Sequence, residues 1–108
     1  MWEQDLAPFG VALHFDEDRA RISLRGEVDV ATGAALVDAA TSAVARYRFV
    51  EIDLAEATSL SEPGVRALVK VTRFAEAYGS LLGFTGATGS VADDLAGAGL
   101  RSFSDFDV

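Results

Sequence analysis

The stretch DLAEATSLSEPGVRALV, residues 53–69, decides the fold of this chain. Apolar and acidic residues alternate over 50–54, which is the period of a half-buried strand. Pro63 suits the first helical position because its ring fixes φ near the helical value, and an amphipathic run follows at once. The pattern therefore predicts a strand over 49–54, a loop, and a helix over 62–78 that starts beside the end of the strand.

The start of this helix carries an acidic residue, Glu62. The free N–H groups and the dipole give a helix start a partial positive charge, so it suits an anion. Ser61 can be the N-cap, whose oxygen accepts one of these N–H groups. A residue before a proline is pushed toward extended backbone, however, which would make Glu62 the cap and leave Ser61 in the loop. These local rules conflict, and both assignments stay open.

The rest of the pattern predicts one domain, 1–108, with a mixed α/β sheet and helices packed mainly on one face. Two period-2 runs joined by an acidic turn predict an N-terminal hairpin. Strands and helices then alternate, which implies parallel pairing. The expected elements are strands over 11–15 and 20–24, a helix over 32–47, the strand and helix already described, a strand over 80–84, a short helix over 90–98 and a final segment over 101–107.

Apolar residues at spacings of three and four mark the buried side of each long helix. Asp29 or Thr32 can cap the first helix, and Gly79 is well placed to end the second. The expected stripes are Leu36, Ala40, Ala43, Val44 and Tyr47 on the first helix, and Val65, Leu68, Val71, Ala75 and Tyr78 on the second.

Composition narrows the class of protein. Half of the residues are hydrophobic, which supports a packed core, and there is no cysteine for a disulfide or a thiolate metal site. We expect a cytoplasmic chain because the sequence has no signal segment and no apolar run long enough to insert into a membrane. The net charge of −8 argues against binding to nucleic acid, because neutralising phosphates requires a surplus of Lys and Arg.

Two short motifs resemble the STAS domain, the fold of anti-sigma-factor antagonists in bacterial partner-switching systems. Residues 24–29, LRGEVD, are similar to the Gly-Glu-Leu-Asp of that family. After the next hydrophobic strand the family typically has Asp-Ser-Ser-Gly, and its first Ser is phosphorylated by an anti-sigma kinase. Aligned without gaps, Ser61 stands at the family's Asp, Glu62 at the phospho-acceptor Ser and Pro63 at the second Ser. Only Gly64 is kept, and the resemblance runs over roughly 11–106.

The resemblance implies a protein-binding module of a transcription-regulating pathway that contacts an anti-sigma factor of the serine-kinase type. Because a carboxylate cannot be phosphorylated by such a kinase, Glu62 predicts regulation independent of phosphorylation at this position. An alternative is an accessory subunit of a membrane transporter, since STAS domains also occur beside transport proteins. Another is a nucleotide sensor that uses the cleft between Asp29 and Gly64, although clustered carboxylates would repel phosphates.

The candidate functional residues surround the start of the second helix. Arg66, Lys70 and Arg73 share one face of it, as either a docking stripe for an acidic partner or a solvated face. Ser61 is a candidate phosphorylation site one residue out of register, and Ser59 is a weaker one. No catalytic set, cofactor motif or metal cluster emerges, so we expect no enzyme. The expected partner-binding or switch residues are Asp29, Ser59, Ser61, Glu62, Gly64, Arg66 and Lys70.

Overall fold

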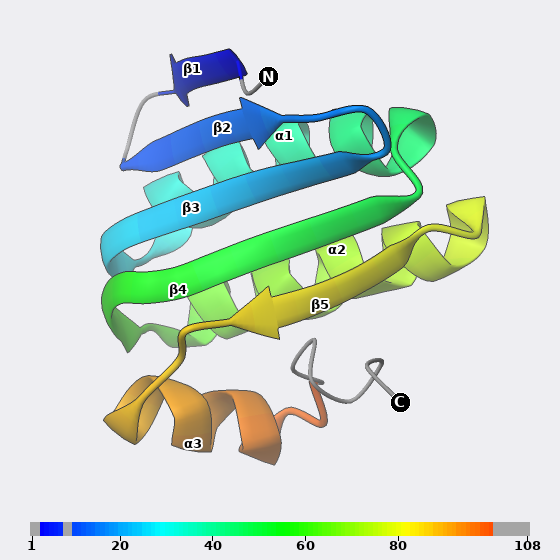
Figure 1. The fold of residues 1–108 in the computed structure, drawn as a ribbon. Coiled ribbons are helices and arrows are strands. Elements are labelled where there is room, and N and C mark those ends of the chain that lie inside the picture. The colour runs from blue at the N-terminus through cyan, green and yellow to red at the C-terminus, as the bar shows by residue number, and fades with distance from the viewer. Residues whose placement is uncertain (1–2, 8–9, 101–108) are drawn as a thin grey trace.

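In the part of the chain that the structure describes, two long helices cover one face of a five-stranded sheet and no helix covers the opposite face (Figure 1). The computed structural model describes the backbone of residues 3–7 and the whole of residues 10–100. None of the helices in this part is long and apolar enough to cross a membrane. The elements are β1 (Glu3–Ala7), β2 (Val11–Phe15), β3 (Arg19–Val28), α1 (Val30–Arg46), β4 (Phe49–Leu60), α2 (Glu62–Tyr78), β5 (Leu81–Thr85) and α3 (Gly89–Gly97).

The sheet is mixed, as the sequence predicted, with strand order β1-β2-β3-β4-β5. The first three strands pair antiparallel, whereas β3, β4 and β5 pair in parallel. At the centre, Ile52 of β4 lies between Ile22 of β3 and Phe84 of β5, and all three side chains are buried. The core therefore forms between this row of the sheet and the two helices.

Two expected strands are longer than predicted, and β1 was not predicted at all. The strand expected over 20–24 is β3, which runs from Arg19 to Val28. We expected the third core strand to end at Leu54 and a loop to follow, but β4 continues to Leu60. It stays paired with β3 because the register shifts twice, after Ser23 and after Gly26, which lets the two strands bend together. Ser59, expected in a loop, therefore lies in a strand. The expected final segment, 101–107, lies outside the described residues.

The buried side of each long helix is largely as predicted. The four expected residues of α1 up to Val44 are buried, and Tyr47 is half-buried and stacks on Phe15 with ring centroids 5.3 Å apart. On α2, the prediction is wrong for Tyr78, which is 60% exposed, and Val65 is only half-buried. The chain leaves the helix at Gly79, in the left-handed region with φ 73°, and Ser80 takes the next buried position.

Gly64 allows the start of α2 to approach the end of β3. A Cβ atom at this position would overlap the carbonyl oxygen of Val28. Gly33 plays a similar part between the helices, since a Cβ atom there would lie 3.1 Å from the Cβ of Ala67. Gly64, the one residue that the chain shares with the Asp-Ser-Ser-Gly motif of the STAS domain, is thus required by packing.

Replacing Gly64 with alanine should lower the free energy of unfolding by about 1–3 kcal/mol, because backbone atoms have to move to admit the methyl group. Urea denaturation of the variant and of the parent chain measures the difference. Gly97→Ala is the matched control, because a Cβ atom there meets nothing within 4 Å and alanine favours a helix. Equal stability of Gly64→Ala and the parent would contradict this account of the junction.

Candidate functional site

Ser61 joins the start of α2 to the end of β3. Its N–H and its hydroxyl both donate to the Val28 carbonyl oxygen, at 3.0 and 2.9 Å. The same hydroxyl oxygen accepts the N–H of Gly64 at 3.1 Å, so Ser61 is the N-cap of α2. This settles the conflict between the local rules: Glu62 is the first helical residue, and the alternative in which it caps the helix is wrong. The contact with Val28, 33 positions away in the sequence, holds Ser61 in the cap position.

Asp29 starts α1 at the same end of the sheet. Its Oδ1 accepts the N–H of Thr32 at 3.0 Å, so Asp29 rather than Thr32 is the cap. The hydrogen bond from the Thr32 backbone holds the pKa of the Asp29 carboxyl below its usual value. Because Val28 pairs with Leu60, the carboxyl ends of β3 and β4 place the starts of α1 and α2 at one edge of the sheet.

Glu62 projects into solvent from the first turn of α2. Its side chain is 82% exposed, and its Oε1 lies 3.1 Å from the Nη1 of Arg66 one turn later. An ion pair this exposed contributes only about 0.3–0.5 kcal/mol to stability. The charge of Glu62 is therefore accessible from solvent, and the Ser61 cap fixes the backbone from which its side chain projects.

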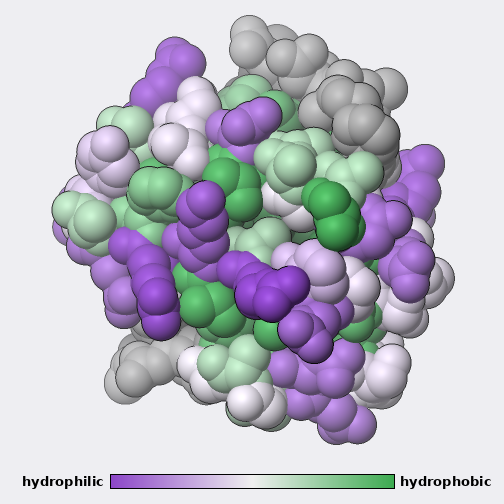
Figure 2. Space-filling view, turned by 180° about the vertical axis from the view of Figure 1, so that it is seen from behind, coloured by the Kyte–Doolittle hydropathy of each residue, from purple (hydrophilic) through white to green (hydrophobic). Residues whose placement is uncertain are grey.

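A shallow groove separates α1 from α2 beside this charge. It has a volume of about 200 Å³ and is lined by Val30, Gly33, Ala34 and Val37 from α1 and by Pro63, Arg66, Ala67 and Lys70 from α2. Figure 2 shows the molecule from the side of these helices, where hydrophobic surface lies between hydrophilic side chains. Of the predicted basic stripe, Arg66 and Lys70 border the groove, whereas Arg73 is exposed but does not line it.

Sequence reasoning missed the half of the groove that comes from α1. Positions 30, 33, 34 and 37 follow the same three-and-four spacing as the buried stripe and could have been recognised as a second apolar side of the helix. The sequence does not show this side clearly, because two of the four residues are Gly and Ala, whose small side chains add little to an apolar pattern. Val30 also precedes the predicted start of the helix.

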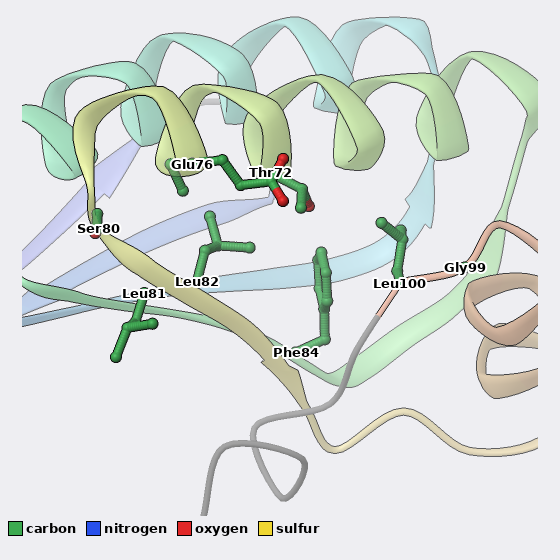
Figure 3. Close-up of a pocket in the computed structure, with 9 residues that line it drawn as sticks. Thr72, Glu76, Ser80, Leu81, Leu82, Phe84, Gly99 and Leu100 are labelled. Carbon is green, nitrogen blue, oxygen red and sulfur yellow. The ribbon is translucent and has the colours of Figure 1, made fainter.

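A second hollow lies on the other side of α2, against β5. Its volume is about 410 Å³, and it is lined by Thr72, Ala75, Glu76, Ser80, Leu81, Leu82, Phe84, Gly99 and Leu100. In Figure 3, Leu82 and Phe84 point toward α2 from the strand, while Leu81 points to the opposite side of the sheet. The hydroxyls of Thr72 and Ser80 donate to backbone carbonyls at 2.9 and 3.0 Å. Among the described residues that line the hollow, Glu76 is the one charged side chain, and a carboxylate does not favour a phosphate.

The predicted site residues thus fall into two groups. Hydrogen bonds, packing and strand pairing bring Asp29, Ser61 and Gly64 together around Val28. Glu62, Arg66 and Lys70 lie on the exposed side of α2 that starts there. Ser59 takes no part in the hydrogen bonds around Val28. It is half-buried in β4, opposite Glu27 of β3.

The solved structures most informative here are of SpoIIAA. The chain is similar to the phosphorylated form of this Bacillus cell fate determinant, with a TM-score of 0.66 and 13% identity over 93% of this chain and 85% of that one. The unphosphorylated form of the anti-sigma factor antagonist SpoIIAA gives a TM-score of 0.62 and 12% identity over 86% and 79% of the two chains. At such identities the likeness establishes the fold alone.

Other comparisons bear on family and length. The chain is similar to Mglu, with a TM-score of 0.63 and 23% identity over 68% of its length, but it spans only 18% of the Mglu chain. No curated protein sequence matches.

A family profile described as "Mlab, STAS domain" matches residues 11–103. Since that match covers most of the chain and the fold is that of SpoIIAA, the resemblance noted in the sequence is confirmed: the chain belongs to the STAS domain family.

Proposed function

We propose that the chain is a protein-binding module, antagonist-like in the manner of SpoIIAA, that contacts an anti-sigma factor of the serine-kinase type through the start of α2. The observation that carries the proposal is the exposed Glu62 carboxylate, 82% accessible at the position aligned with the family's phospho-acceptor. Ser61 and Gly64 tie this turn to the sheet, so the charge is presented without first ordering a loop. Binding rather than catalysis is the role we assign.

Glu62 makes regulation independent of phosphorylation at its own position. A phosphoserine there would carry about −1.5 to −2 charges and three acceptor oxygens, whereas a carboxylate carries one charge and two oxygens. Arg66, 3.1 Å away, offsets part of even that charge. The module is therefore held in one fixed state that mimics the phosphorylated form only in part, and it is matched to a partner that tolerates a negative charge at this point.

Binding of purified anti-sigma kinases, measured by isothermal titration calorimetry, tests the partner class. Glu62→Lys should raise the affinity of the kinase that binds by about tenfold, because it replaces a negative charge in the contact with a positive one. Glu76→Lys is the matched control, since Glu76 is exposed on the same helix but lies near its other end. If no kinase binds while a transporter ATPase subunit does, the transporter alternative replaces this proposal.

We expect no phosphate on Ser61 or Ser59 when the chain is incubated with a bound kinase and Mg-ATP. The Ser61 hydroxyl is half-buried and bonded to both Val28 and Gly64, so a phosphoryl group would break the cap. Intact-mass and peptide mass spectrometry measure the outcome. Glu62→Ser, which restores the family's acceptor, should gain one phosphate in the same assay, and Glu62→Ala should gain none. Stoichiometric phosphate on Ser61 in the parent chain would contradict the proposal that phosphorylation does not regulate this turn.

A further inference from the structure

The groove between α1 and α2 has the properties of a docking surface. Its two walls are built alike, from residues 30, 33, 34 and 37 of α1 and residues 63, 66, 67 and 70 of α2. Gly33 lets the two helices approach closely at its base. At its mouth Val30 is 67% exposed, the highest exposure of any large hydrophobic residue in the described part of the chain. Val30 thus adds exposed apolar surface to a groove that polar side chains border, and apolar surface with a polar rim is a feature of contact sites.

The charges around the groove have one sign. Arg66 and Lys70 are the only charged residues that line it in the described part of the chain, although the chain as a whole carries −8. Among the described residues, Arg66 is paired with Glu62 and Lys70 has no ion-pair partner. An apolar floor beside two cations is complementary to an apolar side chain with a carboxylate next to it.

We propose that this groove binds an acidic amphipathic segment of a partner protein, which inserts an apolar side chain between α1 and α2 and places carboxylates against Arg66 and Lys70. This inference rests on the proposed function and specifies the partner's chemistry. A membrane surface fits less well, since two cations on a chain of charge −8 give little attraction to anionic lipid.

Glu62 has a regulatory part in this arrangement. By pairing with Arg66 at 3.1 Å, it withdraws one of the two cations from the incoming carboxylates and adds a negative charge at the end of the groove. Neutralising Glu62 therefore strengthens binding of an acidic segment. The charge at position 62 and the groove act on the same ligand.

Titration of the isotope-labelled protein with a short designed peptide, followed by NMR, tests the groove without a known partner. The peptide carries leucines along one helical face with glutamates beside them, and its counterpart has lysines in place of the glutamates. The glutamate peptide should shift the amide signals of Gly33, Ala34, Val37 and Ala67, and the lysine peptide should not. Shifts elsewhere, or none up to the solubility limit, would overturn the proposal. So would groove shifts produced by anionic vesicles or by raising the protein concentration alone.

Charge variants with matched controls identify the contacts. Lys70→Glu should weaken binding of the glutamate peptide about fivefold, and Glu62→Gln should strengthen it about twofold. Arg73→Glu makes the same charge reversal on the same helix outside the groove and should change affinity less than about twofold. An Arg73→Glu effect equal to that of Lys70→Glu would mean general charge attraction and would refute a specific groove.

The apolar contact has its own pair of variants. Val30→Asp places a carboxylate at the mouth of the groove and should abolish the shifts, while Ser42→Asp adds the same charge elsewhere on α1 and should preserve them. Both positions are exposed, so circular dichroism should show unchanged folds. If a kinase binds but Lys70→Glu and Val30→Asp leave its affinity unchanged, the groove is wrong and the proposed function stands. If the peptide occupies the groove but no kinase binds, the groove stands and the proposed function is wrong.

Discussion

The carbonyl oxygen of Val28 is the point on which the start of α2 depends. It accepts two hydrogen bonds from Ser61, and it faces Gly64, where any side chain would overlap it. Val28 itself is fully buried, so donors lost here could not be replaced freely by water. The end of β3, the cap of α2 and the first turn of that helix therefore form one unit, and the geometry of the exposed surface follows from contacts beneath it.

The buried contacts around Val28 stabilise the fold, whereas the exposed charge of Glu62 contributes little to stability. Glu62 follows directly after the joined residues, yet its own exposed ion pair with Arg66 adds little to stability. A substitution at position 62 can therefore change charge at a fixed place without loosening the helix. Under the proposed alignment of Glu62 with the family's phospho-acceptor, that freedom accounts for a Glu at this position, whereas Gly64 cannot vary in the same way.

The sequence was sufficient for four of the five strands, the two long helices and the family, because periodicity and capping are local signals. It failed where a distant contact outweighed a local rule. The pre-proline preference favoured Glu62 as the cap, but the bond from Ser61 to Val28 places the cap one residue earlier. Strand β4 likewise runs past Leu54, because register shifts let it keep pairing with β3, and such bulges leave no clear mark in the sequence.

The groove illustrates a different limit. Large apolar residues such as Leu36 identify a buried stripe by their volume, whereas Gly33 and Ala34 become informative only once a second helix lies against them. Their small size brings α2 close and leaves Val30 and Val37 without a full covering. Arg66 and Lys70 then stand beside an apolar floor rather than on a wholly polar face. The choice between a solvated stripe and a docking surface therefore depends on residues of the other helix, and the sequence of α2 alone could not make it.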